Sequence, residues 1–141
     1  MKHAALLAPL GAFFLTGAQI PSQVEISLEN VRNGNGQLHL CLTRNPAHFP
    51  DCGKDPSAVK QSIAASSRSV RMSMAPGAYA VSVLHDENRN GELETFLGIP
   101  REGFGFSRNP RVRFRAPGFE QVRMNFPAGF TRLSIRMQYL L

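Results

Sequence analysis

The sequence predicts an all-β fold, an antiparallel sandwich of about seven strands with one long loop. Short segments alternate apolar and polar residues with a period of two, the pattern of a strand that buries one face. Turns rich in glycine and proline separate these segments, and no window shows convincing helical periodicity. Short alternating strands joined by such turns are typical of immunoglobulin-like or prealbumin-like sandwiches.

The first half of the chain contains most of the clear strand patterns. The expected strands are residues 24–28, 38–42, 70–74 and 79–85, with 58–64 as a weaker candidate. The run N-G-N-G at 33–36 predicts a hairpin turn that joins the first two strands. Three prolines make residues 44–57 irregular, and Pro76 with Gly77 predicts a turn before the strand that follows.

The second half contains a long segment and three further strands. The expected strands are residues 111–115, 122–126 and 133–139. Between residues 85 and 110 the alternation is lost, and we interpret this segment as one long loop. Loops of this length inside a compact domain are uncommon and usually functional.

The N-terminus resembles an export signal. A charged start, Met1-Lys2-His3, precedes a short apolar run, and small residues at 16–18 allow cleavage after Ala18. Pro9 and Gly11 interrupt the run, which is too short for a comfortable membrane span. We expect a signal peptide at 1–18 and one sandwich domain at 19–141, in the periplasm or outside the cell. An N-terminal anchor or a buried segment are the alternatives, and without a cysteine near residue 18 a lipid anchor is not expected.

The chain is basic, with sixteen Lys and Arg against ten Asp and Glu. Removal of residues 1–18, which hold Lys2 and no acid, would lower the net charge from +6 to +5. An exported protein rarely meets nucleic acid, so we expect no nucleic-acid partner. Anionic polysaccharide, lipopolysaccharide or a membrane surface fit this charge, and a merely solvated surface is the simpler alternative.

Two cysteines, Cys41 and Cys52, enclose ten residues. In an oxidising compartment an even count at close spacing indicates a disulfide. The alternatives are a metal pair with His48 and a reactive thiol, although neither has the ligand number or spacing of a recognisable site.

A run of oxygen-bearing side chains follows the strand at 79–85 and has the pattern D-x-N-x-N-G. Its candidate calcium ligands are Asp86, Asn88, Asn90, the carbonyl of Glu92, and Glu94. Position twelve holds Leu97 instead of glutamate and no helix pattern flanks the run, which excludes an EF-hand. We expect a weak calcium site, at about 10⁻⁴–10⁻³ M, or an Asx turn that needs no ion. No other cofactor is expected.

The remaining candidates form a second, less defined group. His85 and Glu102 would serve a carbohydrate-processing enzyme, with Phe104 and Phe106 nearby as a sugar or peptide surface. A hydrogen-bonded structural histidine and aromatics that cap the sandwich are the alternatives. Arginines at 111, 113 and 115 share one side of their expected strand, where they bind anions or protect a sheet edge. No signature of a hydrolase, zinc protease or phosphate loop is present.

Three motifs in fixed order resemble a bacterial family of exported proteins, domain of unknown function 2141. They are P-G-A-Y at 76–79, H-D-E-N-R-N-G at 85–91 and G-I-P-R-E-G-F-G-F-S at 98–107. The similarity covers about residues 24–141 and implies a secreted or periplasmic single-domain β-sandwich with no established activity. This sequence has Glu94 where the family usually has aspartate, and residues 94–97 are one residue shorter than usual.

From these observations we expect a non-enzymatic exported module that binds a ligand or has a structural role. Its long loop would be an interaction surface or a weak calcium site at residues 86–94. The alternatives are an envelope accessory protein that binds anionic glycan or lipid through its arginines, and an enzyme that uses His85 and Glu102.

Overall fold

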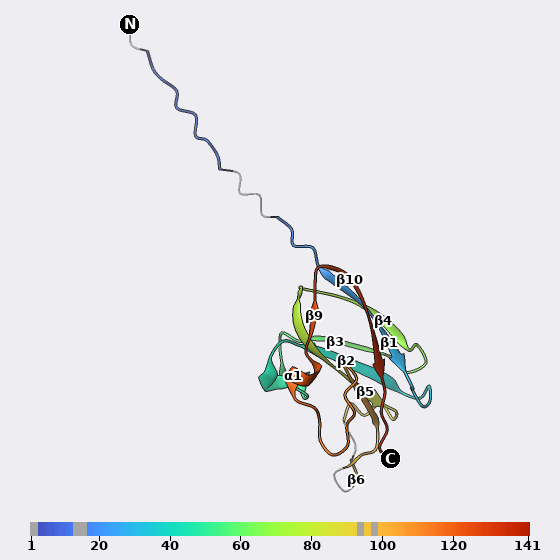
Figure 1. The fold of residues 1–141 in the computed structure, drawn as a ribbon. Helices are drawn as coiled ribbons and strands as arrows, with labels where there is room; N and C mark the ends of the chain where they lie inside the picture. Colours follow the sequence, from blue (N-terminus) through green and yellow to red (C-terminus); the bar gives the residue numbers. More distant parts are fainter. Residues whose placement is uncertain (1–2, 13–16, 93–94, 97–98) are drawn as a thin grey trace.

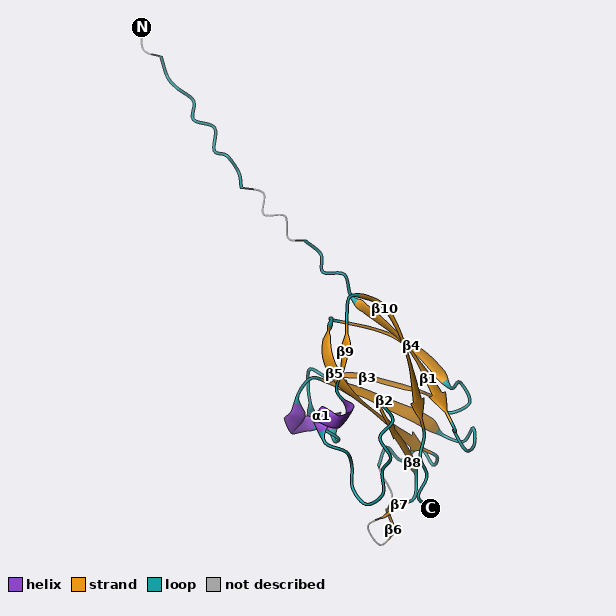
Figure 2. Cartoon of the chain, viewed as in Figure 1, coloured by secondary structure: helices purple, strands orange, loops and turns teal. Residues whose placement is uncertain are grey.

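The computed structural model describes residues 3–12, 17–92, 95–96 and 99–141, which form an extended N-terminal segment and a β-sandwich (Figure 1). Figure 2 shows that strands make up most of the body. The strands are β1 (Ser22–Glu29), β2 (Gln37–Thr43), β3 (Val59–Ala64), β4 (Ser69–Met74), β5 (Gly77–Asp86), β6 (Thr95–Phe96), β7 (Ile99–Pro100), β8 (Gly103–Phe106), β9 (Met124–Phe126) and β10 (Gly129–Arg136). Two 3-10 turns, η1 (Pro46–His48) and η2 (Cys52–Lys54), and one short helix, α1 (Phe119–Val122), complete the fold.

Two sheets form the sandwich, as the alternating patterns predict. One sheet has the order β10-β1-β4, and the other has the order β3-β2-β5-β8, with β9 also paired to β5. The two short strands β6 and β7 pair with each other. All of these pairings are antiparallel except β1 with β10, which is parallel. The expected all-β sandwich is therefore confirmed.

The core lies between the two sheets and is built from the apolar positions of the alternating segments. In β1 the buried residues are Val24, Ile26 and Leu28, and the residues between them are exposed or half-buried. Leu38, Leu40 and Leu42 of β2 and Val81 and Val83 of β5 face them from the opposite sheet. Burial of such side chains contributes about 1.5–3 kcal/mol each relative to full exposure. The period of two in the sequence thus specifies which face of each strand is buried.

The expected hairpin between β1 and β2 is wrong. The two strands belong to different sheets, so residues 30–36 cross from one layer to the other. Both strands bury apolar residues in the same core, β1 from one sheet and β2 from the other. Gly36 closes the crossing with a φ of +68°, and a Cβ atom there would lie 1.9 Å from the carbonyl oxygen of Asp86. The N-G-N-G run is therefore not a hairpin turn, and its last glycine packs closely against the end of β5.

The expected strand at 111–115 is also wrong. These residues form an irregular segment with a bend at 113–115, and Phe114 is 97 % exposed. The backbone N–H of Val112 donates to Oε1 of Gln138 at 3.0 Å, and none of the described strands pairs with this segment. Residues 111–115 alternate between arginine and apolar residues, but this alternation alone does not show that a neighbouring strand pairs with the segment. Val122, expected in the next strand, instead ends α1, which is too short to show a helical period.

Part of the segment expected as a loop is the strand β8. It pairs with β5, with Phe104 opposite Leu84 and Phe106 opposite Ser82. Gly103 faces the ring of Tyr139, where a Cβ atom would lie 2.2 Å from Cε1. The two phenylalanines point to the other face and join a second apolar cluster on the outside of the sheet. The sequence conceals this strand because its inward residues are glycines.

The residues before the sandwich extend away from it (Figure 1). Leu6, Leu7 and Leu10 are almost fully exposed there. None of the described residues belongs to a helix that is long and apolar enough to cross a membrane.

Candidate functional site

A disulfide and a buried carboxylate fix the segment after β2. Cys41 is bonded to Cys52, with 6.3 Å between their Cα atoms. This bond confirms the expected pairing and excludes the metal pair with His48 and the reactive thiol. The hydroxyl of Thr43 donates to Asp55 at 2.6 Å, and the hydroxyl and backbone N–H of Ser57 donate to its other oxygen. These hydrogen bonds lower the pKa of Asp55 to about 2.

His85 is a buried structural residue with both ring nitrogens in hydrogen bonds. Nε2 donates to the carbonyl oxygen of Asn35 at 2.8 Å, and Nδ1 lies 2.8 Å from the hydroxyl of Tyr139. Burial raises the pKa of the Tyr139 phenol. The guanidinium of Arg32 lies over the Tyr139 ring, 4.5 Å from its centroid, and also forms an ion pair with Glu87. Because both nitrogens are in use, His85 has none left for a substrate.

Asp86 begins a tight turn after β5 and is only 1 % exposed. Its Oδ2 accepts from Nε2 of His39 at 2.9 Å and from the backbone N–H of Gly91 at 2.7 Å, and its Oδ1 accepts from the backbone N–H of Asn90. Burial opposes ionisation, but the hydrogen bonds from His39, Gly91 and Asn90 outweigh it and hold the pKa of Asp86 below its usual range. The turn therefore surrounds an ionised carboxylate.

The oxygens expected to bind calcium form a chain of Asx turns. Oδ1 of Asn88 accepts from the N–H of Asn90, and Oδ1 of Asn90 accepts from the N–H of Glu92. Gly91, at the sixth position of the run, has a φ of +73°. Among the described residues no group of three or more His, Cys, Asp or Glu is placed to hold a metal ion. Glu94 and Leu97 lie outside the described residues, so the calcium site stays a prediction.

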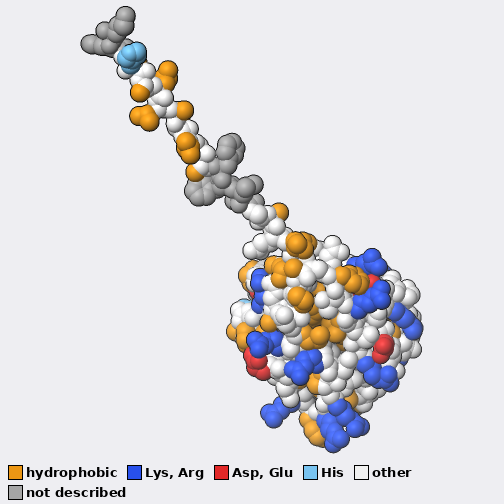
Figure 3. Space-filling view, turned by 45° about the horizontal axis from the view of Figure 1, so that its top comes forward, with side chains coloured by type: hydrophobic (Ala, Val, Ile, Leu, Met, Phe, Trp, Pro, Cys, Tyr) orange, Lys and Arg blue, Asp and Glu red, His pale blue; other side chains and the backbone are white. Residues whose placement is uncertain are grey.

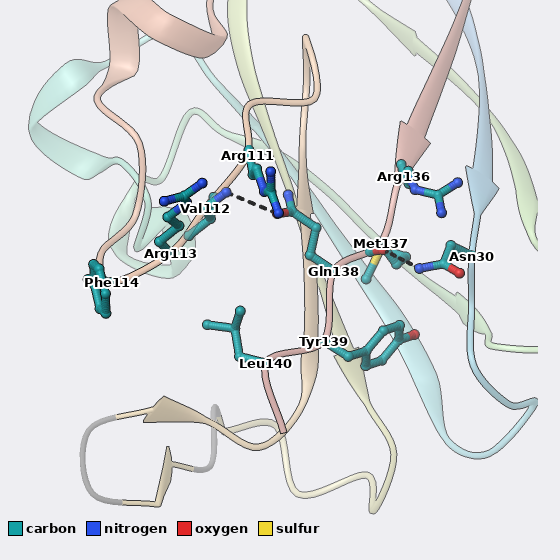
Figure 4. A pocket seen from close by; sticks show the side chains of 10 residues that line it. All are labelled: Asn30, Arg111, Val112, Arg113, Phe114, Arg136, Met137, Gln138, Tyr139 and Leu140. Atoms are coloured by element: carbon teal, nitrogen blue, oxygen red, sulfur yellow. Dashed lines mark hydrogen bonds between the residues drawn. The ribbon is translucent and has the colours of Figure 1, made fainter.

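Two neighbouring hollows lie beside the segment 111–116. The smaller has a volume of about 460 Å³ and lies between residues 111–114 and residues 136–140 (Figure 4). The larger is a groove of about 1190 Å³ that is lined by residues of β2, β3, β5 and β8. Pockets that hold small ligands usually measure about 300–1,000 Å³. The smaller hollow lies within this range, and the groove is somewhat larger.

Three arginines line the smaller hollow, which we call the arginine hollow. Arg111 and Arg113 come from the irregular segment, and Arg136 ends β10 on the other side, with its guanidinium directed away from the other two (Figure 4). No acidic residue is among the described residues that line it. In the part of the chain that the structure describes, these three guanidinium groups form no ion pair. The hollow is therefore a local concentration of uncompensated positive charge.

Basic side chains are otherwise scattered over the molecule. Figure 3 shows blue side chains spread across the visible face, with few red ones between them. Arg71 pairs with Glu25 and Arg123 pairs with Glu120 on the surface. The arginine hollow differs from these sites because it combines several cations with a concave surface.

A family model for an uncharacterized protein conserved in bacteria, domain of unknown function 2141, matches residues 26–133. This match spans more than half of the chain. The chain belongs to this family. No curated protein and no solved structure matches it.

The three motifs that resemble the domain of unknown function 2141 have structural tasks in this member. In the first, the hydroxyl of Tyr79 donates to the carbonyl oxygen of Ala75 at 2.7 Å and closes the turn before β5. In the second, His85 and Asp86 fix the end of β5 as described above. In the third, the hydroxyl of Ser107 is fully buried, accepts from the N–H of Val81 and donates to the carbonyl oxygen of Val122. The motifs thus account for the frame that supports both hollows.

Of the four residues expected to form a ligand surface, two line the groove and two are buried elsewhere. Phe104 and Phe106 line the groove, although they are only 8 % and 6 % exposed. Of the described residues, His85 and Glu102 line neither hollow, and both are buried. The sequence did not indicate Arg136 or Leu140, because the end of β10 and the residues after it lie beside residues 111–114 only in the folded protein. The shared arginine side of β10, at Arg132 and Arg136, was the available signal for the first of them.

Proposed function

We propose that this protein is an exported, non-enzymatic binding module that takes an anionic envelope component in its arginine hollow. The observation that carries the proposal is that Arg111, Arg113 and Arg136 line one hollow, with no acid among its described lining residues. Arginine suits this task because its planar guanidinium donates paired hydrogen bonds to phosphate or carboxylate oxygens. The shared chemistry is an anionic oxygen group on a glycan or a lipid.

The buried histidine favours binding over catalysis. A general base needs a free nitrogen or oxygen within reach of a substrate, whereas both nitrogens of His85 are bonded inside the protein. Glu102 is 4 % exposed and lines neither hollow. These placements support a module that holds its ligand without transforming it.

The proposal includes export through a signal peptide at 1–18 and a weak calcium site in residues 86–94. Two observations support the calcium site, the ionised carboxylate of Asp86 and the positive φ of Gly91 at the position where a calcium loop bends. Its role would be to brace the turn beside the groove, which Gly91 and Glu92 also line. An Asx turn without an ion is the competing interpretation.

An NMR titration with inorganic phosphate tests the arginine hollow. We expect resonances of Arg111, Arg113 and Arg136 to shift, and the double variant Arg111→Gln/Arg113→Gln to bind phosphate about tenfold more weakly. Raised salt should weaken binding by the native protein, because exposed charges are screened.

A second double variant provides the matched control. Arg71→Gln/Arg132→Gln removes the same charge from β4 and β10, where both arginines lie near the ring of Phe130 and neither lines the arginine hollow. We expect it to bind phosphate as the native protein does. Equal weakening by the two double variants, or shifts spread over all arginines, would show that only net charge matters and would reject the arginine hollow as a site.

A further inference from the structure

The groove and the arginine hollow are two parts of one continuous surface. Val112, Arg113, Phe114 and Leu140 line both of them. A ligand held in the arginine hollow therefore lies next to side chains that also line the groove. The question is which chemistry would fill both spaces at once.

The groove has an apolar part where it meets the sheet, next to polar side chains that also line it there, which are His39, Lys60, Gln61, Ser62 and Ser82. Leu84 of β5 and Phe104 of β8 are opposite each other in register and both line it. The Cys41–Cys52 disulfide also lines it. Phe114, on the wall shared with the arginine hollow, is 97 % exposed. Contiguous exposed apolar surface marks interaction sites, and Phe114 extends the apolar part of the groove at this edge.

The groove and the arginine hollow differ in the charge of the residues that line them. The charged residues along the groove nearly balance, with Lys60, Arg113 and Arg115 against Asp51 and Glu92. The arginine hollow has three arginines and no acid among its described lining residues. An anionic group is therefore held best in the hollow, and an uncharged chain is held best in the groove.

We infer that the two spaces bind one amphiphile, a lipid with its phosphate headgroup in the arginine hollow and its acyl chain in the groove. This inference rests on the proposed function, to which it adds the chemical class of the ligand. Phosphate accounts for the charge of the hollow, and the acyl chain accounts for the exposed apolar wall that phosphate alone would leave in water.

A series of n-alkyl phosphates tests the inference on the protein as residues 19–141, with inorganic phosphate as the chainless probe. Transfer of one methylene group out of water strengthens binding by about fourfold. We expect affinity to rise with chain length from hexyl to dodecyl phosphate and then to level off when the groove is full. Titration calorimetry below the concentration at which each probe forms micelles measures this rise.

Two variants separate the chain from the headgroup. Leu84→Gln and Phe114→Ser each remove an apolar side chain that is at least partly exposed, so the fold should persist, which circular dichroism verifies. We expect each variant to lose about tenfold or more in affinity for dodecyl phosphate and to keep its affinity for inorganic phosphate. The control Phe130→Ser removes another exposed phenylalanine, from β10, and should change neither affinity.

The outcomes distinguish this inference from the proposed function. Phosphate binding in the hollow with no gain from the chain would overturn the lipid and leave the anion site intact. Equal affinity for dodecyl phosphate and dodecyltrimethylammonium would show an apolar groove without anion recognition, and would overturn both. A dimer in sedimentation that buries the groove and prevents any gain from the chain would identify a second copy as the occupant and overturn the inference.

Discussion

At Asp86, a carboxylate that is almost fully buried accepts hydrogen bonds from His39 and from the backbone of Asn90 and Gly91. Its depressed pKa keeps it ionised at neutral pH. The turn that it organises lies beside the groove, which His39 and Gly91 also line. One side chain thus joins the end of β5, the neighbouring strand β2 and the proposed calcium loop.

Thermal unfolding in chelator and in about 10 mM calcium tests this loop. A ligand that binds only the folded state raises the free energy of unfolding by about 1.4 kcal/mol at ten times its dissociation constant. We expect calcium to raise the melting temperature of the native protein. In Asp86→Asn we expect a lower melting temperature that calcium no longer changes.

Asp55→Asn is the matched control for this measurement. Asp55 is also a buried carboxylate that accepts several hydrogen bonds, but it belongs to the segment after β2. We expect this variant to be less stable and to keep the full response to calcium. If the native protein has the same melting temperature in chelator and in calcium, the loop is an Asx turn that binds no calcium.

Among the elements, the strands that were predictable are those whose inward residues are apolar. In β1 and β4 the buried positions follow the alternation in the sequence, and in β2 and β5 they do so apart from Thr43, Ala80 and Asp86, which are also buried. In β8 the inward positions are glycines, because Tyr139 and Ile135 occupy the space where a side chain would be. Such a close approach depends on how the end of the chain packs, and a local pattern cannot show it.

The site was predictable to a similar extent. The arginines at 111 and 113 were candidates for anion binding from the sequence alone, but as one face of a strand. The other side of the hollow is formed by residues 136–140. These residues lie beside the arginines because the Gln138 side chain forms hydrogen bonds with the backbone of Val112 and Pro110. Those two hydrogen bonds join residues more than twenty positions apart, beyond the reach of any local signal.

Gly103→Ala tests the close packing of β8 against the chain after β10. The added methyl group would lie 2.2 Å from the Tyr139 ring, which is held by its bonds to His85 and Arg32. Overpacking of this kind costs about 1–3 kcal/mol. We expect the free energy of unfolding, measured by urea denaturation, to fall by about that amount.

Gly34→Ala is the control substitution for Gly103→Ala. Its added methyl group would meet the Cβ atom of Ser66 at 3.6 Å, an ordinary contact. We expect no loss of stability beyond about 0.5 kcal/mol. If the two alanine variants unfold at the same urea concentration, the glycine at 103 is not required by the packing of Tyr139.

For the molecule as a whole, the disulfide links the fold to the compartment in which it forms. Cys41 and Cys52 both line the proposed lipid groove, so their oxidation state affects the wall of the site. Disulfides persist in oxidising compartments and are rare in the cytosol. Export and the bond between these cysteines should therefore change together.

Production of the full chain and of a chain without residues 2–18 in a bacterial host tests this link. From the full chain we expect a periplasmic product whose mass corresponds to residues 19–141 and whose cysteines do not react with a thiol label. From the shortened chain we expect a cytosolic product with two reactive thiols. A full-length product in the membrane fraction would instead support the N-terminal anchor. Reactive thiols in a periplasmic product would contradict the bond itself, because the oxidising compartment would then have failed to close it.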